Sequence, residues 1–113
     1  MNSAELLKRV THGWILLVGE FRGGQVEKIG FTDMKSGLKA HRVQITYLVE
    51  RVSLLGTEIV FLKRRAPETV LEPEQVIIPL EKGTKYAFEI EGLKRDKGLT
   101  TAFMGSAEPE LIE

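Results

Sequence analysis

The sequence predicts a single all-β domain of five strands with one minor helical segment. Its 113 residues are 42% hydrophobic and 28% charged, which suits one folded core and leaves no room for two. Residues 42–50 alternate apolar and polar side chains, the period of a strand with one buried face. Pro67, Pro73 and Pro79 punctuate the longest turn-rich stretch and exclude a long helix there.

The first third of the chain reads as a short helical turn followed by a long strand. Residues 3–10 carry a possible N-cap, Ser3, and an apolar edge, so we expect one or two helical turns. Residues 14–21 form a buried-type run, and residues 26–32 continue a β pattern. Gly23-Gly24 between them indicates either a tight hairpin or a strand kinked between two sheets, with the kink preferred.

The middle of the chain contains a turn and two strands. Asp33 and Gly37 bracket a turn, since Asp favours turn openings and Gly their closing positions. Residues 42–50 form the second predicted strand and residues 58–63 the third. The alternation places four apolar side chains of the second strand in the core, namely Val43, Ile45, Tyr47 and Val49.

The last third begins with the proline-rich connector, in which a helical turn starting at Pro73 is expected. Residues 86–91 alternate as a fourth strand, residues 95–98 form a hairpin turn, and residues 99–104 pair back as the fifth. We therefore expect one domain over residues 1–107. Residues 108–113 are predicted to be a loose acidic tail.

This order of elements resembles the OB fold, a five-stranded Greek-key barrel that often carries a helix between its third and fourth strands. The resemblance covers residues 13–105, with SH3-like barrels and small sandwiches as alternatives. Residues 28–37, followed by the strand at 42–49, are similar to the first hairpin of small phage-type single-stranded DNA-binding proteins. The chain departs from cellular single-strand binders in lacking a long Gly/Gln/Pro linker. The resemblance implies an OB-type barrel that binds single strands.

Composition and spacing argue against several other classes. Cysteine is absent, which excludes disulfides, Cys-based zinc sites and a Cys nucleophile. His12 and His41 lack metal-ligand spacing, and no serine stands in a nucleophile elbow. Glu89 and Glu91 share a face that should be solvated. We therefore expect no catalysis, metal or cofactor, and, because no apolar signal core or membrane span is visible, a cytoplasmic location.

Charge is segregated along the chain although the formal net charge is zero. Residues 22–65 hold nine basic against four acidic residues, whereas residues 66–81 hold four Glu and no base. A polyanion responds to charge within about one Debye length, roughly 10 Å. A basic region can therefore bind nucleic acid on a neutral chain.

Binding of single strands needs cations for the phosphates and aromatic planes for the bases. The basic region supplies the cations. The best stacking candidates lie in strands with apolar side chains on both faces, because one of those faces need not belong to the core. Phe31, Tyr47, Tyr86 and Phe88 lie in apolar alternations and are predicted to be core. The predicted nucleic-acid-binding residues are Trp14, Arg22, Lys28, Lys35, Lys39, His41, Arg42, Phe61, Lys63, Arg64 and Arg65.

The leading hypothesis is a non-catalytic binder of single-stranded nucleic acid, DNA sooner than RNA, serving replication or recombination. The alternative is a protein-interaction module or assembly subunit that docks a partner through exposed apolar positions such as Leu48. The acidic end would dock a protein partner or shield the basic groove, and a homo-oligomer would present a longer site.

Overall fold

Six strands and one short 3₁₀ turn make up the computed structural model, which describes residues 15–105 and 107–112. The predicted N-terminal helical turn lies outside those residues. Each predicted strand is present and most are longer than expected. In chain order the elements are β1 (Ile15–Thr32), β2 (Lys39–Ser53), β3 (Gly56–Arg65), η1 (Pro73–Gln75), β4 (Lys85–Asp96), β5 (Leu99–Met104) and β6 (Glu110–Leu111).

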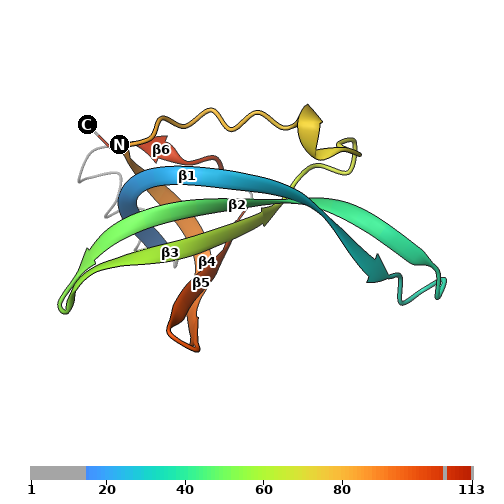
Figure 1. Ribbon diagram of the computed structural model, residues 1–113, viewed down its shortest axis with the longest axis horizontal. Helices are drawn as coiled ribbons and strands as arrows, with labels where there is room; N and C mark the ends of the chain where they lie inside the picture. Colours follow the sequence, from blue (N-terminus) through green and yellow to red (C-terminus); the bar gives the residue numbers. More distant parts are fainter. Residues whose placement is uncertain (1–14, 106, 113) are drawn as a thin grey trace.

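Five of these strands form a closed ring (Figure 1). β1 pairs antiparallel with β2, β2 with β3, and β5 with β4, whereas β3 and β5 run parallel. The ring closes because the first part of β1 also pairs antiparallel with β4. The expectation of a five-stranded all-β fold is thus met as a ring of five strands.

β1 takes part in both halves of the ring because it bends. Its register with β2 shifts between Phe21 and Gly23, which marks a bulge at Arg22. Gly23 has φ of 142°, a region that side chains disfavour. The glycine pair is therefore a strand kink, as preferred from the sequence, and not a hairpin turn.

The ring interior holds the core, and it follows the predicted alternation. Tyr47, Val49, Tyr86, Phe88 and the other alternate apolar residues of β2 and β4 are buried. The connector after β3 covers one end of the ring, where its apolar residues pack against this core. The residues of the connector that do so are Val70, Val76, Ile78 and Leu80. The helical turn expected at Pro73 is a single 3₁₀ turn.

Two expectations about charged segments are wrong. Glu89 is 8% exposed and not solvated, whereas Glu91 is exposed as expected, and the Gly105 N–H donates to the Glu89 backbone carbonyl. The described part of the predicted acidic tail is not loose either. β6 pairs antiparallel with β4, opposite Tyr86 and Ala87, since the first half of β4 has an edge that the short β5 leaves uncovered.

Candidate nucleic-acid interface

Three adjoining hollows run from the β3–β5 junction to the β1–β2 hairpin. The first, about 200 Å³, is shared by β2, β3 and Phe103 of β5. The second, about 410 Å³, lies between the β1–β2 hairpin and the start of the connector. The third, about 210 Å³, lies further along that hairpin.

The hollows connect through shared side chains. Arg42 and Arg65 line the first and second, and Phe31 and His41 line the second and third. They therefore form one continuous surface, which we call the basic track. Its charged and aromatic residues are Lys28, Phe31, Lys39, His41, Arg42, Lys63, Arg64, Arg65, Phe103 and two carboxylates, Glu68 and Glu72, so that six Lys or Arg side chains stand against two Glu.

The alternating direction of side chains along β3 places two cations at one end of the track. Leu62 is buried in the ring, so its neighbour Lys63 points to the outer face. Arg65 shares that face and lies opposite Gln44 of β2. On the other side, Lys63 is in register with Phe103 of β5, whose side chain is 54% exposed. Two cations and an accessible ring thus share one surface.

Phe31 and Arg42 form the aromatic centre of the track. The Arg42 guanidinium carbon lies 5.6 Å from the Phe31 ring centroid, within the range of a cation–π contact. The Nε atom of Arg42 is buried and has no hydrogen-bond partner among the described residues. Its N–H therefore has unused hydrogen-bonding capacity, which a ligand could reach only if the Arg42 side chain shifts.

The expectation that Phe31 belongs to the core is wrong, because its side chain is 43% exposed. β3 pairs with β2 only from Gln44 onward. The part of the β1–β2 hairpin beyond that point, which extends to one side of the ring in Figure 1, has no third strand against it. Alternation alone does not bury Phe31 there, since no third strand continues the sheet beside that part of the hairpin.

Acidic side chains hold some of the predicted binding residues. Lys28 pairs with Glu72 of the connector at 3.0 Å. Arg64 is bound bidentately by Glu108, with both N–O distances 3.0 Å. That hydrogen bonding raises the pKa of Arg64 above its ordinary value. These two basic side chains line the track with their charges already neutralised.

The other track cations have no carboxylate partner within the described part of the chain. Among the residues that the structure describes, no carboxylate forms an ion pair with Lys39, Arg42, Lys63 or Arg65. Because β1, β2 and β3 carry them on one connected surface, their fields add. The track is therefore basic although the formal charge of the chain is zero.

Three predicted residues lie outside the track, and a fourth lies outside the described residues. Arg22 is held by Glu50 at 3.0 Å and by Glu20 at 3.5 Å. Lys35 is exposed in the predicted turn, where the Asp33 carboxylate accepts its backbone N–H. Phe61 is half-buried on the outer face opposite Leu48.

Trp14, the fourth, lies outside the described residues. Sequence reasoning in turn missed Phe31 and Phe103 as track residues. No local signal identified Phe103, because its neighbour Lys63 lies on a strand distant in the chain. The pairing of Lys63 with Phe103 depends on β3 and β5 meeting in parallel.

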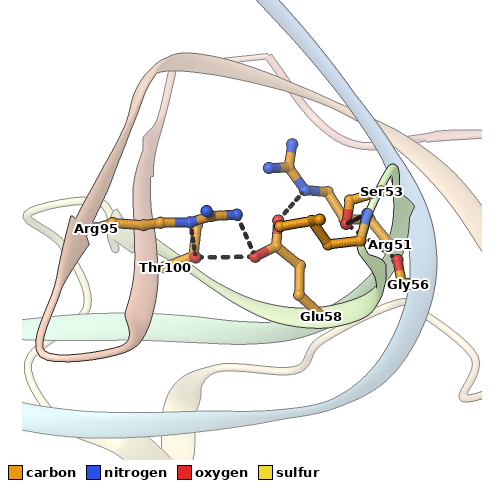
Figure 2. Close-up of polar contacts among 7 residues, drawn as sticks. Arg51, Ser53, Gly56, Glu58, Arg95 and Thr100 are labelled. Atoms are coloured by element: carbon orange, nitrogen blue, oxygen red, sulfur yellow. Dashed lines mark hydrogen bonds and ion pairs between the residues drawn. The ribbon is translucent and has the colours of Figure 1, made fainter.

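A second polar cluster lies where the β2–β3 and β4–β5 hairpins meet (Figure 2). The Glu58 carboxylate accepts from Arg51 Nε at 2.6 Å, from Arg95 Nη2 at 2.8 Å and from the Thr100 hydroxyl at 3.1 Å. The Arg51 hydrogen bond is the main reason why the pKa of Glu58 is lowered. A carboxylate held ionised by two arginines is a poor proton donor, so this cluster fits a structural clasp.

Within residues 15–105 and 107–112, no group of three or more His, Asp or Glu is placed to hold a metal ion. No helix in that part of the chain is long and apolar enough to cross a membrane. Comparison with protein-family models, curated proteins and solved structures gives no match to this chain. The functional argument therefore starts from the geometry of the track.

Proposed function

We propose that this chain binds single-stranded nucleic acid along the basic track, DNA sooner than RNA, in a non-catalytic role in replication or recombination in the cytoplasm. The observation that carries the proposal is the continuity of the three hollows. They bring unpaired cations and two exposed aromatic rings onto one surface. Cations that follow the phosphates and rings that stack on bases are what sequence-tolerant single-strand binding requires.

The strand order supports a finer assignment, an OB-type Greek-key barrel. The ring runs β1-β2-β3-β5-β4 and closes on β1, with β3 parallel to β5. OB barrels bind oligonucleotides on the face of their second and third strands, between the loops that join strands one to two and four to five. The track crosses β2 and β3 and reaches the β1–β2 hairpin, in keeping with that mode of binding.

The track also suggests how the strand would lie. Phe103 and Lys63 would engage one nucleotide, and Phe31 with Arg42 another further along. The Arg42 guanidinium would donate to a base carbonyl or a phosphate oxygen, since both are strong acceptors. Four unpaired cations predict a slope of log affinity against log salt of about −3 for a single strand.

The test is titration of a labelled oligo-dT of about 15 nucleotides, a length near the upper site size of one OB fold. Wild-type protein should bind at low salt and lose affinity with the predicted slope. The variant Lys63→Ala/Arg65→Ala should bind about tenfold or more weakly and with a shallower slope. Lys82→Ala is the matched control, because Lys82 is exposed and lines no part of the track.

Two results would refute the proposal. One is an absence of binding at low salt. The other is a Lys63/Arg65 variant that binds as tightly as the Lys82 control. Oligo-rU of the same length separates DNA from RNA preference, with the deoxy strand expected to bind more tightly.

A protein-interaction module is the second candidate, and one observation favours it. The β2–β3 turn carries apolar side chains that are almost fully exposed, Leu54 and Leu55 foremost. Leu48, the position suggested by the sequence, is half-buried beside Phe61 and offers little surface.

A further inference from the structure

The second hollow of the basic track is walled by two segments that are distant in the chain (Figure 1). The β1–β2 hairpin forms one wall with Phe31 and Arg42, and the start of the connector forms the other. Lys28 of the hairpin and Glu72 of the connector bridge the two walls with an ion pair of 3.0 Å. At about 410 Å³, the hollow falls within the size range of small-ligand pockets. One nucleobase is smaller than such ligands, so the hollow has room for a base.

The connector wall is held in place by backbone hydrogen bonds. The Ala66 N–H donates to the Val43 carbonyl of β2 at 3.0 Å, and the Val70 N–H donates to the Pro67 carbonyl at 2.9 Å. The second bond closes the turn that carries Glu68, and Val70 itself packs against the core. The backbone around Glu68 is therefore fixed before a ligand arrives, which lowers the ordering cost of binding.

Glu68 places a hydrogen-bond acceptor among the cations of the track. It lines the hollow together with Phe31 and Arg42. Within residues 15–105 and 107–112, no basic side chain forms an ion pair with Glu68, whereas the other carboxylate of the hollow, Glu72, is already paired. A negative charge opposes the binding of phosphates, so Glu68 does not serve that part of the proposed function. A carboxylate is instead suited to accept from an N–H group of a base.

Bases differ in what they offer to a carboxylate. Cytosine carries an exocyclic amino group at N4, a donor from which Glu accepts, whereas thymine carries a carbonyl at the corresponding position. A carboxylate that faces this carbonyl sets two acceptors against each other, which disfavours thymine. Bases turned out of a strand are commonly stacked on an aromatic ring and hydrogen-bonded along their pairing edge. Phe31, which is 43% exposed, and Glu68 offer these two kinds of contact on the walls of one hollow.

We propose that this hollow receives one base of the bound strand and prefers a base with an exocyclic amino group over thymine or uracil. The proposal rests on single-strand binding along the basic track and assigns the base preference of that site. The base lies against the Phe31 ring, and its amino group donates to the Glu68 carboxylate. Because the other contacts of the track are to phosphates and ring faces, oligo-dT still binds, with lower affinity than an amino-bearing strand.

Titration of labelled oligo-dC and oligo-dU, each of about 15 nucleotides, tests this preference. The two strands share one backbone and differ only on the pairing edge of the base, and slightly alkaline buffer keeps oligo-dC single-stranded. Wild type should bind oligo-dC about fivefold or more tightly than oligo-dU, the low end of what one base contact discriminates. Glu68→Gln should bring the ratio of the two dissociation constants close to one. The amide can donate to the uracil carbonyl as well as accept from the cytosine amine.

Glu74→Gln is the matched control. Glu74 is an exposed residue of η1 in the same connector and lines none of the three hollows of the track. The control removes the same charge as Glu68→Gln, so any general gain in phosphate attraction affects both strands alike and cancels in the ratio. Glu74→Gln should therefore keep the wild-type ratio of the two dissociation constants.

A wild type that binds oligo-dC no more tightly than oligo-dU would overturn this proposal and leave single-strand binding intact. A Glu68→Gln variant that keeps the wild-type ratio would overturn it as well. If no oligonucleotide bound at low salt, oligo-dT included, the proposed function would fail and the base preference with it. The two failures are therefore distinguishable.

Discussion

Arg64 of β3 and Glu108 of the C-terminal segment form a bidentate ion pair, with Nη1 and Nη2 of the arginine each 3.0 Å from a carboxylate oxygen. The arginine is 15% exposed and the glutamate 68%. The pair joins the end of the basic track to the segment that carries β6. Glu108 therefore occupies the two nitrogens of Arg64 that could otherwise form bidentate hydrogen bonds with a phosphate.

Glu108→Gln should raise the affinity for oligo-dT several-fold and steepen its salt dependence. The freed guanidinium adds about one phosphate contact, so the slope of log affinity against log salt should change by about −0.7. The same variant should lose about 0.5–1 kcal/mol of stability, because exposed ion pairs contribute little. Glu110→Gln, a neighbouring change outside this pair, serves as control. Unchanged affinity and slope in Glu108→Gln would place Arg64 outside the contact surface.

Glu58 should make the fold sensitive to acid. Its folded pKa lies below its ordinary value, chiefly because Arg51 donates to it. A depressed carboxylate pKa contributes stability above the unfolded pKa, about 4.5, and that contribution is lost as pH falls through the folded pKa. The urea midpoint of wild type should therefore exceed that of Glu58→Gln at neutral pH.

The difference in urea midpoint between wild type and Glu58→Gln should narrow below about pH 4.5. Glu68→Gln is the control, since Glu68 is exposed and has no ion pair within the described residues. A constant difference from pH 7 to pH 3 would show that the clasp does not act through the charge of Glu58.

Gly19→Ala should destabilise the ring. A Cβ at Gly19 would overlap Cγ1 of Val49 and lie 2.7 Å from the Glu50 carbonyl oxygen, so β1 and β2 must move apart. Overpacking of this kind costs about 1–3 kcal/mol. Gly92→Ala provides the contrast, because nothing lies within 4 Å of its Cβ position. The midpoint temperature of thermal unfolding should fall markedly in Gly19→Ala and change little in Gly92→Ala.

The local sequence pattern was sufficient to predict the strands and most of the core, but it was insufficient to predict which residues form the candidate binding surface. The alternation of Val43 to Val49 identifies β2 and its buried face because one side of that strand is covered along this length. The same logic failed at Phe31, where β3 no longer accompanies β2, and at Glu89, which is buried although the alternation of β4 places it on the outer face. Coverage depends on where other strands end, which the period of a single strand does not encode.

Contacts between distant parts of the chain account for the features that the sequence pattern did not predict. Two-residue β6 has no sequence signature of its own and exists because β4 leaves an edge open beside Tyr86. The Lys and Arg side chains that line the track all come from residues 22–65, where basic residues exceed acidic ones. Which of them remain unpaired depends on carboxylates far along the chain, namely Glu72 for Lys28 and Glu108 for Arg64.

Phe103→Ala should weaken oligo-dT binding without affecting the fold. Its ring is 54% exposed and lies in register with Lys63, so it is accessible to a base while the lysine neutralises the adjoining phosphate. A base stacked on an aromatic side chain contributes about 1–3 kcal/mol, which is about five- to a hundredfold in affinity. Loss of a neutral ring should leave the salt slope unchanged, unlike the Lys63/Arg65 variant. Phe103→Tyr, which keeps the stacking plane, should bind like wild type. If Phe103→Ala bound as tightly as Phe103→Tyr, the ring would have no stacking role and the strand would bind by phosphate contacts alone.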